Sequence, residues 1–293
     1  MNRDRRPGPS TRVRVREFTS AGVRSHEDRL ATEEPLEIRL AWPGRPAHRV
    51  AVTMRTPGQD FELATGLLYA EGVLGSAEDL RTVAYCTDRS LSPAQEYNVV
   101  TVELAVPPRR EPPARYDGLA GATSACGVCG TQSIDDVLAM AELAGVPTEL
   151  VPVPVVASDV LLTLPGRLRA EQRVFDSTGG LHAAGLFDAA GATIAVREDI
   201  GRHNAVDKVV GSRLLAGALT PTPTRTPVLC VSGRIGFEIV QKAVAAGVGV
   251  LAAVGAPSSL AVDLATRTGL CVAGFVRDGR FVIYSSPERV GGV

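Results

Sequence analysis

The chain has 293 residues, of which 45% are hydrophobic and 22% charged, as in a soluble globular protein with one large or two ordinary domains. Its net charge is −1, so no overall positive field favours nucleic acid or an anionic membrane as a partner. We find neither an apolar run of about 18 residues nor an apolar signal segment at the N-terminus, and therefore expect a cytoplasmic protein.

The N-terminal third predicts a small α+β domain. Residues 1–10 are rich in Arg and Pro and predict a disordered tail. Alternation of apolar and polar residues predicts a strand over 11–18 and a hairpin whose strands cover 36–42 and 49–54.

A helix and a further strand complete this domain. Thr56 and Gln59 form a capping box with a proline between them, which predicts a helix that starts at once. A strand is expected over 96–106, and the proline-rich segment that follows it cannot pair in a sheet. We therefore predict one domain of residues 11–114 and a second of residues 115–293.

The second domain alternates helical periodicity with short, continuous apolar strands. This pattern predicts an α/β fold with a mainly parallel sheet covered by helices on both faces. The strands are expected over 193–196, 228–232, 248–254, 270–276 and 281–285, and the helices over 203–216, 235–246 and 257–268.

Two thiols, Cys126 and Cys129, stand three positions apart in a glycine-rich segment just before a helix-start signal at Ser133. The positive end of a helix favours thiolate over thiol, so both cysteines are expected to be reactive. The other three cysteines occur in apolar, strand-like runs and are expected to be inert core residues. They are Cys86, Cys230 and Cys271.

Three functions remain open for this pair. A structural zinc site needs four ligands, so Cys126 and Cys129 would require two more, such as His182 and His203. A thioredoxin-like redox pair normally follows a strand early in its fold, whereas this pair follows a proline-rich segment. A sulfur carrier would accept sulfane sulfur from a donor persulfide by the exchange chemistry of disulfides.

Two polar segments of the second domain are dense in functional side chains. In the first segment, two glycines precede His182. Its imidazole is either exposed by a tight loop or buried as a structural histidine. The second, residues 197–208, crowds charged and titratable groups, with His203 among them, and is either a functional site or a solvated helix start.

Two further polar segments each follow a predicted strand and open a helix. One contains Ser232 and Arg234, and the other contains Pro257 and Ser258. Each alone is a weak signal because serine and proline are ordinary capping residues, but successive parallel strands bring their carboxyl ends to one edge of a sheet. We expect the two loops to lie side by side and to hold a ligand with several phosphates. Neither has the glycine spacing of ATP- or NAD-binding loops.

Lysine is almost absent from the chain. Of the 31 basic residues, 29 are arginine, and the lysines are Lys208 and Lys242, both in helices that carry motif-like segments. The two lysines either have specific roles or occur by chance in an arginine-biased composition.

Taken together, these motifs resemble those of the formate dehydrogenase accessory sulfurtransferase family, FdhD. The resemblance extends along most of the chain and is weakest in the first twenty residues. It is carried by the segments 123–130, 178–184, 198–208, 232–234, 241–243 and 256–261.

The resemblance implies a sulfurtransferase that accepts sulfur from an L-cysteine desulfurase. It would pass this sulfur to the molybdenum bis(molybdopterin guanine dinucleotide) cofactor before formate dehydrogenase receives that cofactor. Cys126 matches the family's persulfide-bearing cysteine, and Cys129 matches its second thiol. A homodimer is the family expectation, and we expect no metal held by the protein itself.

The resemblance also implies a cofactor-binding region near the C-terminus. The residues carried over by their match are Phe275, Val276, Arg277, Asp278, Gly279 and Arg280. The polar segments add four candidate cofactor-binding residues, which are Ser232, Arg234, Ser258 and His203.

The family resembles cytidine deaminases in fold, so the second domain is expected to be cytidine-deaminase-like. Deaminase chemistry needs His-x-Glu followed by Pro-Cys-x-x-Cys. In this chain Ala184 stands where the glutamate would be, and the Cys-x-x-Cys precedes His182. Hydrolytic deamination is therefore not expected.

The predicted function is a sulfur relay through a Cys126 persulfide. A thiol–disulfide oxidoreductase and a zinc-stabilised cofactor chaperone are the alternatives. We hypothesise from charge density that His203, Lys208 or Arg202 stabilises the persulfide or the incoming cofactor.

Overall fold

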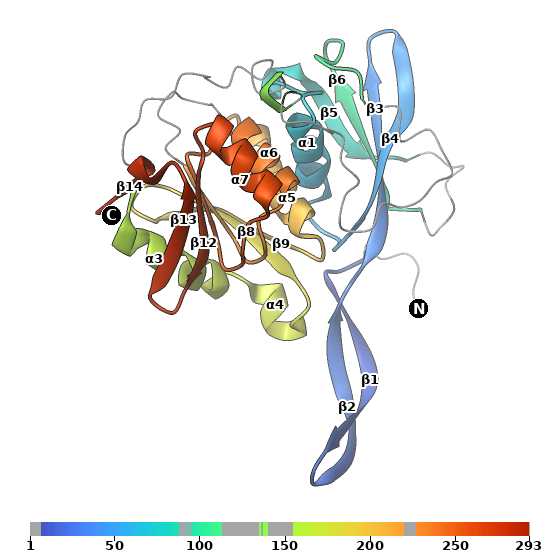
Figure 1. Cartoon of the computed structure of the whole chain (residues 1–293). Coiled ribbons are helices and arrows are strands. Elements are labelled where there is room, and N and C mark those ends of the chain that lie inside the picture. Colours follow the sequence, from blue (N-terminus) through green and yellow to red (C-terminus); the bar gives the residue numbers. More distant parts are fainter. Residues whose placement is uncertain are drawn as a thin grey trace.

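Two β-sheets with helices between and around them form the body of the molecule, and a two-stranded arm projects from it (Figure 1). The computed structural model describes residues 7–87, 92, 95–112, 135, 137–139, 155–219 and 227–292. Within these residues, no helix is both long and apolar enough to cross a membrane.

The arm consists of β1 (Ser10–Thr19) and β2 (Gly22–Ala31), which pair in antiparallel register. The strand predicted over 11–18 is therefore confirmed. Its partner β2 escaped prediction because charged residues occur on both of its faces, which hides the alternation typical of a strand. Residues 1–6 of the predicted tail lie outside the described residues.

The N-terminal sheet has the strand order β4-β3-β6-β5. Its strands are β3 (Glu34–Trp42), β4 (Arg45–Arg55), β5 (Leu80–Tyr85) and β6 (Val99–Leu104), and a 3-10 turn (Ala77–Asp79) precedes β5. The predicted hairpin of β3 and β4 is confirmed, and β6 lies parallel to β3. Leu36, Ile38 and Leu40 of β3 are fully buried, so one face of this sheet joins the core with α1 (Asp60–Ala70).

Helix α1 begins later than the capping box predicts. Its first residue is Asp60, and Gln59 before it has a left-handed backbone with φ of 54°. The amide of Thr56 donates instead to Asp199 Oδ2 at 3.1 Å, and its carbonyl accepts from Lys208 Nζ at 2.9 Å. The predicted start was wrong because side chains that lie far away in the sequence bind the backbone groups of Thr56.

The C-terminal sheet has the strand order β13-β12-β11-β10-β8-β9. Its strands are β8 (His182–Phe187), β9 (Thr193–Asp199), β10 (Val228–Val231), β11 (Val250–Ala253), β12 (Cys271–Arg277) and β13 (Arg280–Ser285). The α/β class is confirmed, but the sheet is mixed rather than mainly parallel. Strands β10, β11 and β12 are parallel, whereas the other three described pairings are antiparallel. Two of these arise because β8–β9 and β12–β13 are hairpins, whose short turns reverse the chain.

Helices cover both faces of this sheet (Figure 1). Helices α5 (Arg202–Leu215), α6 (Phe237–Ala245) and α7 (Ser259–Arg267) agree with the predicted helices to within two residues at each end. Helix α3 (Ser158–Ala170) packs on the opposite face and is followed by α4 (Arg173–Thr178). Near the C-terminus, β14 (Val290–Gly291) pairs with β7 (Val156–Ala157) after a 3-10 turn (Pro287–Arg289).

The cysteines of the sheet behave as predicted. Cys230 and Cys271 are fully buried in the core under α3, and burial raises the pKa of each thiol to about 12. Such thiols are not nucleophiles near neutral pH. Cys86 differs from the prediction, because it is half-buried and its sulfur accepts a hydrogen bond from Arg39 at 3.7 Å.

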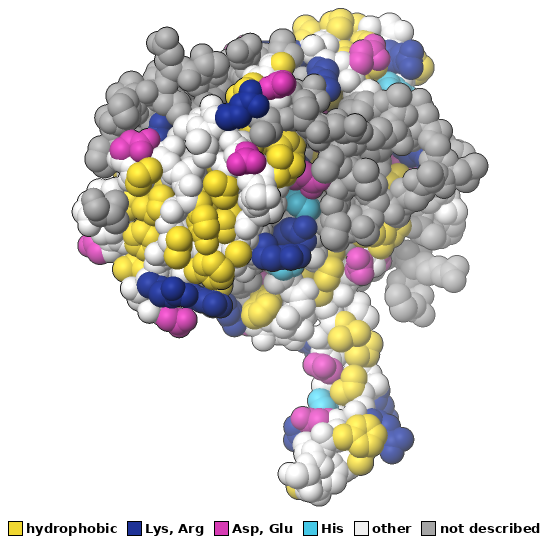
Figure 2. All heavy atoms as spheres, viewed as in Figure 1, with side chains coloured by type: hydrophobic (Ala, Val, Ile, Leu, Met, Phe, Trp, Pro, Cys, Tyr) yellow, Lys and Arg dark blue, Asp and Glu magenta, His cyan; other side chains and the backbone are white. Residues whose placement is uncertain are grey.

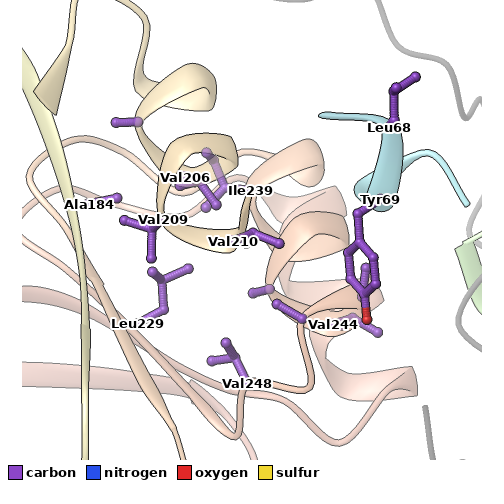
Figure 3. Packing of buried hydrophobic residues seen from close by; sticks show 14 of the residues in the cluster. Leu68, Tyr69, Ala184, Val206, Val209, Val210, Leu229, Ile239, Val244 and Val248 are labelled. Carbon is purple, nitrogen blue, oxygen red and sulfur yellow. The ribbon is translucent and has the colours of Figure 1, made fainter. Parts of the chain in front are cut away.

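One hydrophobic core joins the two predicted domains. The same buried cluster includes residues of α1, α5 and α6, and Figure 3 shows Tyr69 of α1 beside Val210 of α5 and Val244 of α6. The N-terminal sheet and the C-terminal sheet therefore share the helices between them. The boundary at residue 114 remains a prediction from composition.

Helices α1 and α5 cross with their backbones in contact. A Cβ atom on Gly66 would lie 1.9 Å from the carbonyl oxygen of Asp207, and one on Gly211 would lie 1.8 Å from that of Glu62. No side chain fits at either position, so these two glycines set the distance between the helices.

Candidate functional site

Three loops lie side by side where the parallel strands β10, β11 and β12 end. Ile235 N donates to Ala256 O at 3.0 Å, and Ser258 N donates to Ile235 O at 3.0 Å, so the loops after β10 and β11 are joined. Phe275 N, near the end of β12, donates to Gly255 O at 3.1 Å. The side-by-side placement predicted for the two polar loops is confirmed.

Close packing of these loops depends on Gly255. A Cβ atom at this position would lie 2.8 Å from the carbonyl oxygen of Gly233 and 3.1 Å from the Cα atom of Arg234. The absent side chain lets the loops approach, and helices α6 and α7 start from them. The positive ends of these two helices therefore point to the same edge of the sheet, where they favour anions.

The three predicted residues of these loops have different roles. Arg234 is exposed at the edge. Ser258 caps α7, because its hydroxyl accepts from the amide of Ala261 at 3.3 Å. The hydroxyl of Ser232 accepts from the amide of Ala183 at 2.9 Å and so ties β8 to the end of β10.

The predicted segment 275–280 forms the tip of the β12–β13 hairpin. Asp278 and Gly279 both have positive φ, of 55° and 72°, as in the two-residue turns that match the twist of a hairpin. Arg277 and Arg280 flank the turn and are exposed, and Figure 2 shows basic side chains gathered below the hydrophobic patch of this region. Val276 is fully buried, so its side chain belongs to the core rather than to a binding surface.

A pocket of about 750 Å³ opens at the same edge of the sheet. Its floor includes Ser232 and Val254, which follow β10 and β11, and its walls come from α3, α4 and the loop before β8. Arg169 of α3 lies over the ring of Phe175 at 4.8 Å. The sequence showed the glycine loop and His182, but no signal pointed to the residues that α3 brings to the pocket. These are Pro165, Leu168 and Arg169.

Glu198 holds the wall of this pocket in place. Its carboxylate accepts from the amide of Val174 at 2.9 Å and from that of Phe175 at 2.7 Å, at the start of α4. Although Glu198 belongs to β9, its carboxylate thus lies at the N-terminal end of α4, where a negative charge is favourable. Glu198 thereby fixes the orientation of Phe175 toward the pocket.

The imidazole of His182 is half-buried at the pocket. Burial lowers the pKa of His182 below its ordinary value, and the nearby Arg202 guanidinium lowers it further. Both effects favour the neutral imidazole, which can donate and accept hydrogen bonds at the pocket. The positive charge near this edge comes from arginine, at positions such as Arg202 and Arg234.

Two groups that charge density suggested for the site are buried instead. His203 is 7% exposed, and its Nε2 lies 3.1 Å from Glu238 Oε2 of α6. Lys208 is fully buried, with Nζ at 2.7 Å from Asp199 Oδ2. Both groups are therefore engaged in buried ion pairs, and their roles toward a persulfide or cofactor stay predictions. The third proposed group, Arg202, lies near the pocket residue His182.

Both lysines of the chain form buried ion pairs. Lys208 pairs with Asp199, and Lys242 of α6 pairs with Asp207 of α5 at 2.6 Å. Burial raises the pKa of Asp207 to about 6, so its charged form depends on the neighbouring ammonium. Each lysine therefore has its own buried carboxylate partner, which favours purposeful placement of the two lysines over chance.

The cysteine pair lies outside the described residues. The helix predicted after it is represented by residues 135 and 137–139, which are helical, and Val137 is buried in the main core. The carboxylate of Asp135 pairs with Arg267 at 2.6 Å, in the last turn of α7. This ion pair and the Ser258 cap stand at opposite ends of α7.

The part of the chain that the structure describes holds no group of three His, Cys, Asp or Glu side chains arranged as metal ligands. Of the two histidines considered as further zinc ligands, His182 lines the pocket and His203 lies 3.1 Å from Glu238.

Comparison with known proteins shows which family this chain is related to. The model of the FdhD/NarQ family matches residues 31–291. The chain belongs to this family. It is 49% identical over 278 residues to a protein of Streptomyces coelicolor named "Sulfur carrier protein FdhD", with 95% of this chain and 93% of that protein covered. A protein of Mycobacterium tuberculosis with the same name is 46% identical over 282 residues, with 94% and 97% covered.

A solved structure shares the fold of this member of the FdhD/NarQ family. It is the crystal structure of a protein from Desulfotalea psychrophila described as a formate dehydrogenase accessory protein. The TM-score is 0.67 at 22% sequence identity, and the match covers 96% of this chain and 99% of that chain. This likeness supports the α/β architecture.

Proposed function

We propose that this chain is a sulfur carrier that accepts sulfane sulfur as a persulfide on Cys126 and delivers it to a guanine-dinucleotide molybdenum cofactor. The observation that carries the proposal is membership of the FdhD/NarQ family over residues 31–291, in a chain that has the Cys126-x-x-Cys129 pair. Relatives that share nearly half of their residues with it are named sulfur carriers.

Loading of the carrier follows from thiol exchange chemistry. The Cys126 thiolate attacks the terminal sulfur of a donor persulfide, a new S–S bond forms, and the donor cysteine leaves as a thiolate. No net oxidation is needed, because the transferred sulfur has the oxidation level of a persulfide both in the donor and in the product. A cysteine desulfurase is the class of enzyme that presents such a persulfide. In this scheme the protein is a sulfurtransferase, and Cys129 is its assisting thiol.

The proposed acceptor carries guanine bases and pyrophosphates, and the described edge of the sheet has groups suited to both. The Phe175 ring and the Arg169 guanidinium offer flat surfaces on which a base can stack. Arg234 is exposed beside the starts of α6 and α7, where phosphate oxygens are favoured. A formate dehydrogenase would receive the cofactor after sulfuration.

The donor half of the proposal is tested by mass spectrometry. After incubation with a cysteine desulfurase and L-cysteine, the protein is expected to gain one sulfur atom, about 32 Da, on the peptide that contains Cys126. Cys126→Ser should abolish this gain, whereas Cys230→Ser, which alters a buried thiol, should leave it unchanged. A disulfide between Cys126 and Cys129 in place of the adduct would favour a thiol–disulfide oxidoreductase. Stoichiometric zinc that is lost in Cys126→Ser would favour the cofactor chaperone.

The acceptor half is tested with GDP, a guanine nucleotide that contains a pyrophosphate. Arg234→Ala is expected to raise the Kd for GDP about tenfold in calorimetry, because it removes a charge-assisted hydrogen bond. Arg267→Ala is the matched control, since this exposed arginine lies at the other end of α7 and pairs with Asp135. An unchanged Kd in Arg234→Ala would contradict phosphate binding at this edge of the sheet.

A further inference from the structure

Gln172 is a buried polar residue whose side chain the fold leaves without a partner. It is 4% exposed, and it lies between α3 and α4, where it lines the pocket. Within the described part of the chain, its carboxamide takes part in no hydrogen bond. Burying a carboxamide costs free energy unless it is hydrogen-bonded, so the large majority of such groups have a partner. An unpaired carboxamide at a pocket therefore indicates that a ligand supplies the missing hydrogen bonds.

The backbone around Gln172 explains why its side chain is unpaired. Gln172 is the N-cap residue of α4, a position whose side chain often accepts from an amide of the first turn. Here the carboxylate of Glu198 accepts from two amides of this turn instead. Gln172 N donates to Arg169 O at 3.2 Å, and Gln172 O accepts from Asp176 N at 3.0 Å, so the backbone of the residue is fixed. The carboxamide therefore stays available to the pocket.

The rest of the pocket is suited to a flat heterocycle. Most of its side chains are apolar, and its volume of about 750 Å³ lies within the usual range of small-molecule sites, about 300–1,000 Å³. The ring of Phe175 is half-buried there beside the Arg169 guanidinium, and both groups can stack on planar rings. Two other polar side chains are already engaged, since Arg169 pairs with Asp176 at 2.5 Å and Ser232 binds the amide of Ala183.

A carboxamide can bind the edge of a ring with both of its polar atoms. Its N–H group donates and its C=O group accepts, so it pairs with a ring N–H that stands next to a ring C=O. This lactam edge belongs to the 2-amino-4-oxopyrimidine ring, which guanine and pterin share. Both ring systems occur in the acceptor proposed above, a molybdopterin guanine dinucleotide.

We infer that Gln172 binds the lactam edge of the acceptor's heterocycle, while Phe175 stacks on the plane of the ring. The inference rests on the proposed function, because it takes the guanine-dinucleotide cofactor as the ligand. It adds a residue that holds a ring to Arg234, which is proposed to hold phosphate. The hydrogen bonds of the carboxamide form only with the ligand, so Gln172 contributes to binding and not to the stability of the free chain.

Calorimetric titration of Gln172→Leu with GDP and with neopterin, a pterin without phosphate, tests the inference. Leucine has nearly the size of glutamine but makes no hydrogen bond, so the Kd of the ligand with the recognised ring should rise about 10- to 100-fold. A rise for GDP alone assigns the site to guanine, and a rise for neopterin alone assigns it to the pterin. Inorganic pyrophosphate, which has no ring, should bind the variant and the unaltered chain equally.

Gln241→Leu is the matched control. Gln241 is also 4% exposed, but its Nε2 donates to the carbonyl oxygen of Ala70 at 3.2 Å. Its replacement should lower the midpoint of urea unfolding and leave the Kd values unchanged, because it removes a buried hydrogen bond away from the pocket. Gln172→Leu should show the reverse pattern, with an unfolding midpoint at least as high as that of the unaltered chain.

The outcomes separate the inference from the proposed function. Equal Kd values for Gln172→Leu and an unaltered chain that binds either probe would overturn the inference and leave the proposed function in place. If the unaltered chain bound neither GDP nor neopterin, the proposed acceptor would fail and the inference with it. An unfolding midpoint lowered as much as in Gln241→Leu would show that the carboxamide of Gln172 stabilises the fold instead of a ligand.

Discussion

Asp199→Ala is expected to lower the free energy of unfolding by about 3–5 kcal/mol, because it leaves the Lys208 ammonium buried without its carboxylate. Both side chains of this pair are fully buried, with Nζ and Oδ2 at 2.7 Å. The same carboxylate also accepts from the amides of Thr56 and Gly201. Urea unfolding followed by circular dichroism measures the change.

The control for this prediction is an ion pair on the surface of the protein, where solvent surrounds it. Arg81 and Glu103 are 3.0 Å apart on the surface, where side-chain exposure is 58% and 37%. Glu103→Ala is expected to cost less than about 1 kcal/mol, since exposed pairs contribute little. If Asp199→Ala and Glu103→Ala lowered the free energy of unfolding equally, the buried pair would have no special part in joining β9, α5 and the segment before α1.

The Asp199–Lys208 pair explains why the charged segment 197–208 is so dense. Its acidic and basic residues bind the backbone around Thr56, so the segment joins the N-terminal part of the chain to the C-terminal sheet. The same segment places Glu198 under α4 and Arg202 beside His182. Loss of the pair is therefore expected to disturb the pocket as well as the stability of the fold.

Gly66→Ala is expected to cost about 3 kcal/mol or more, at the upper end of the range for overpacked cores. The added methyl carbon would lie 1.9 Å from a carbonyl oxygen of α5, and this contact can be relieved only by moving one helix away from the other. Gly211→Ala meets the same obstacle from the other side, at 1.8 Å from a carbonyl oxygen of α1. Thermal and urea unfolding should both record the loss.

Gly166→Ala provides the matched control for these two variants. Gly166 lies in α3, is exposed, and has no atom within 4 Å of an added Cβ. Because alanine is the better helix former, this change is expected to stabilise the chain by up to about 1 kcal/mol. If Gly166→Ala lowered stability as much as Gly66→Ala, crowding between α1 and α5 would not be the cause of the destabilisation.

Local sequence patterns were enough to predict much of the fold. Apolar runs and helical periodicity located the strands and helices after residue 190, because both patterns arise from the regular spacing of side chains along one element. The side-by-side placement of the loops at Ser232 and Ser258 was also predictable, since successive parallel strands end at one edge. The Cys126-x-x-Cys129 pair and the order of the motifs were enough to indicate the family.

Contacts between distant segments decided the rest. The sequence by itself determined most strands and helices after residue 190, the Cys-x-x-Cys motif and the family, because these depend on residues that are neighbours in the chain. Tertiary structure alone decided that Lys208 and His203 are buried, that Thr56 binds Asp199 instead of capping a helix, and that α3 and α4 complete the pocket. The physical reason is that burial, ion pairing and helix crossing depend on which residues fold together, and local periodicity carries no information about partners outside the same element.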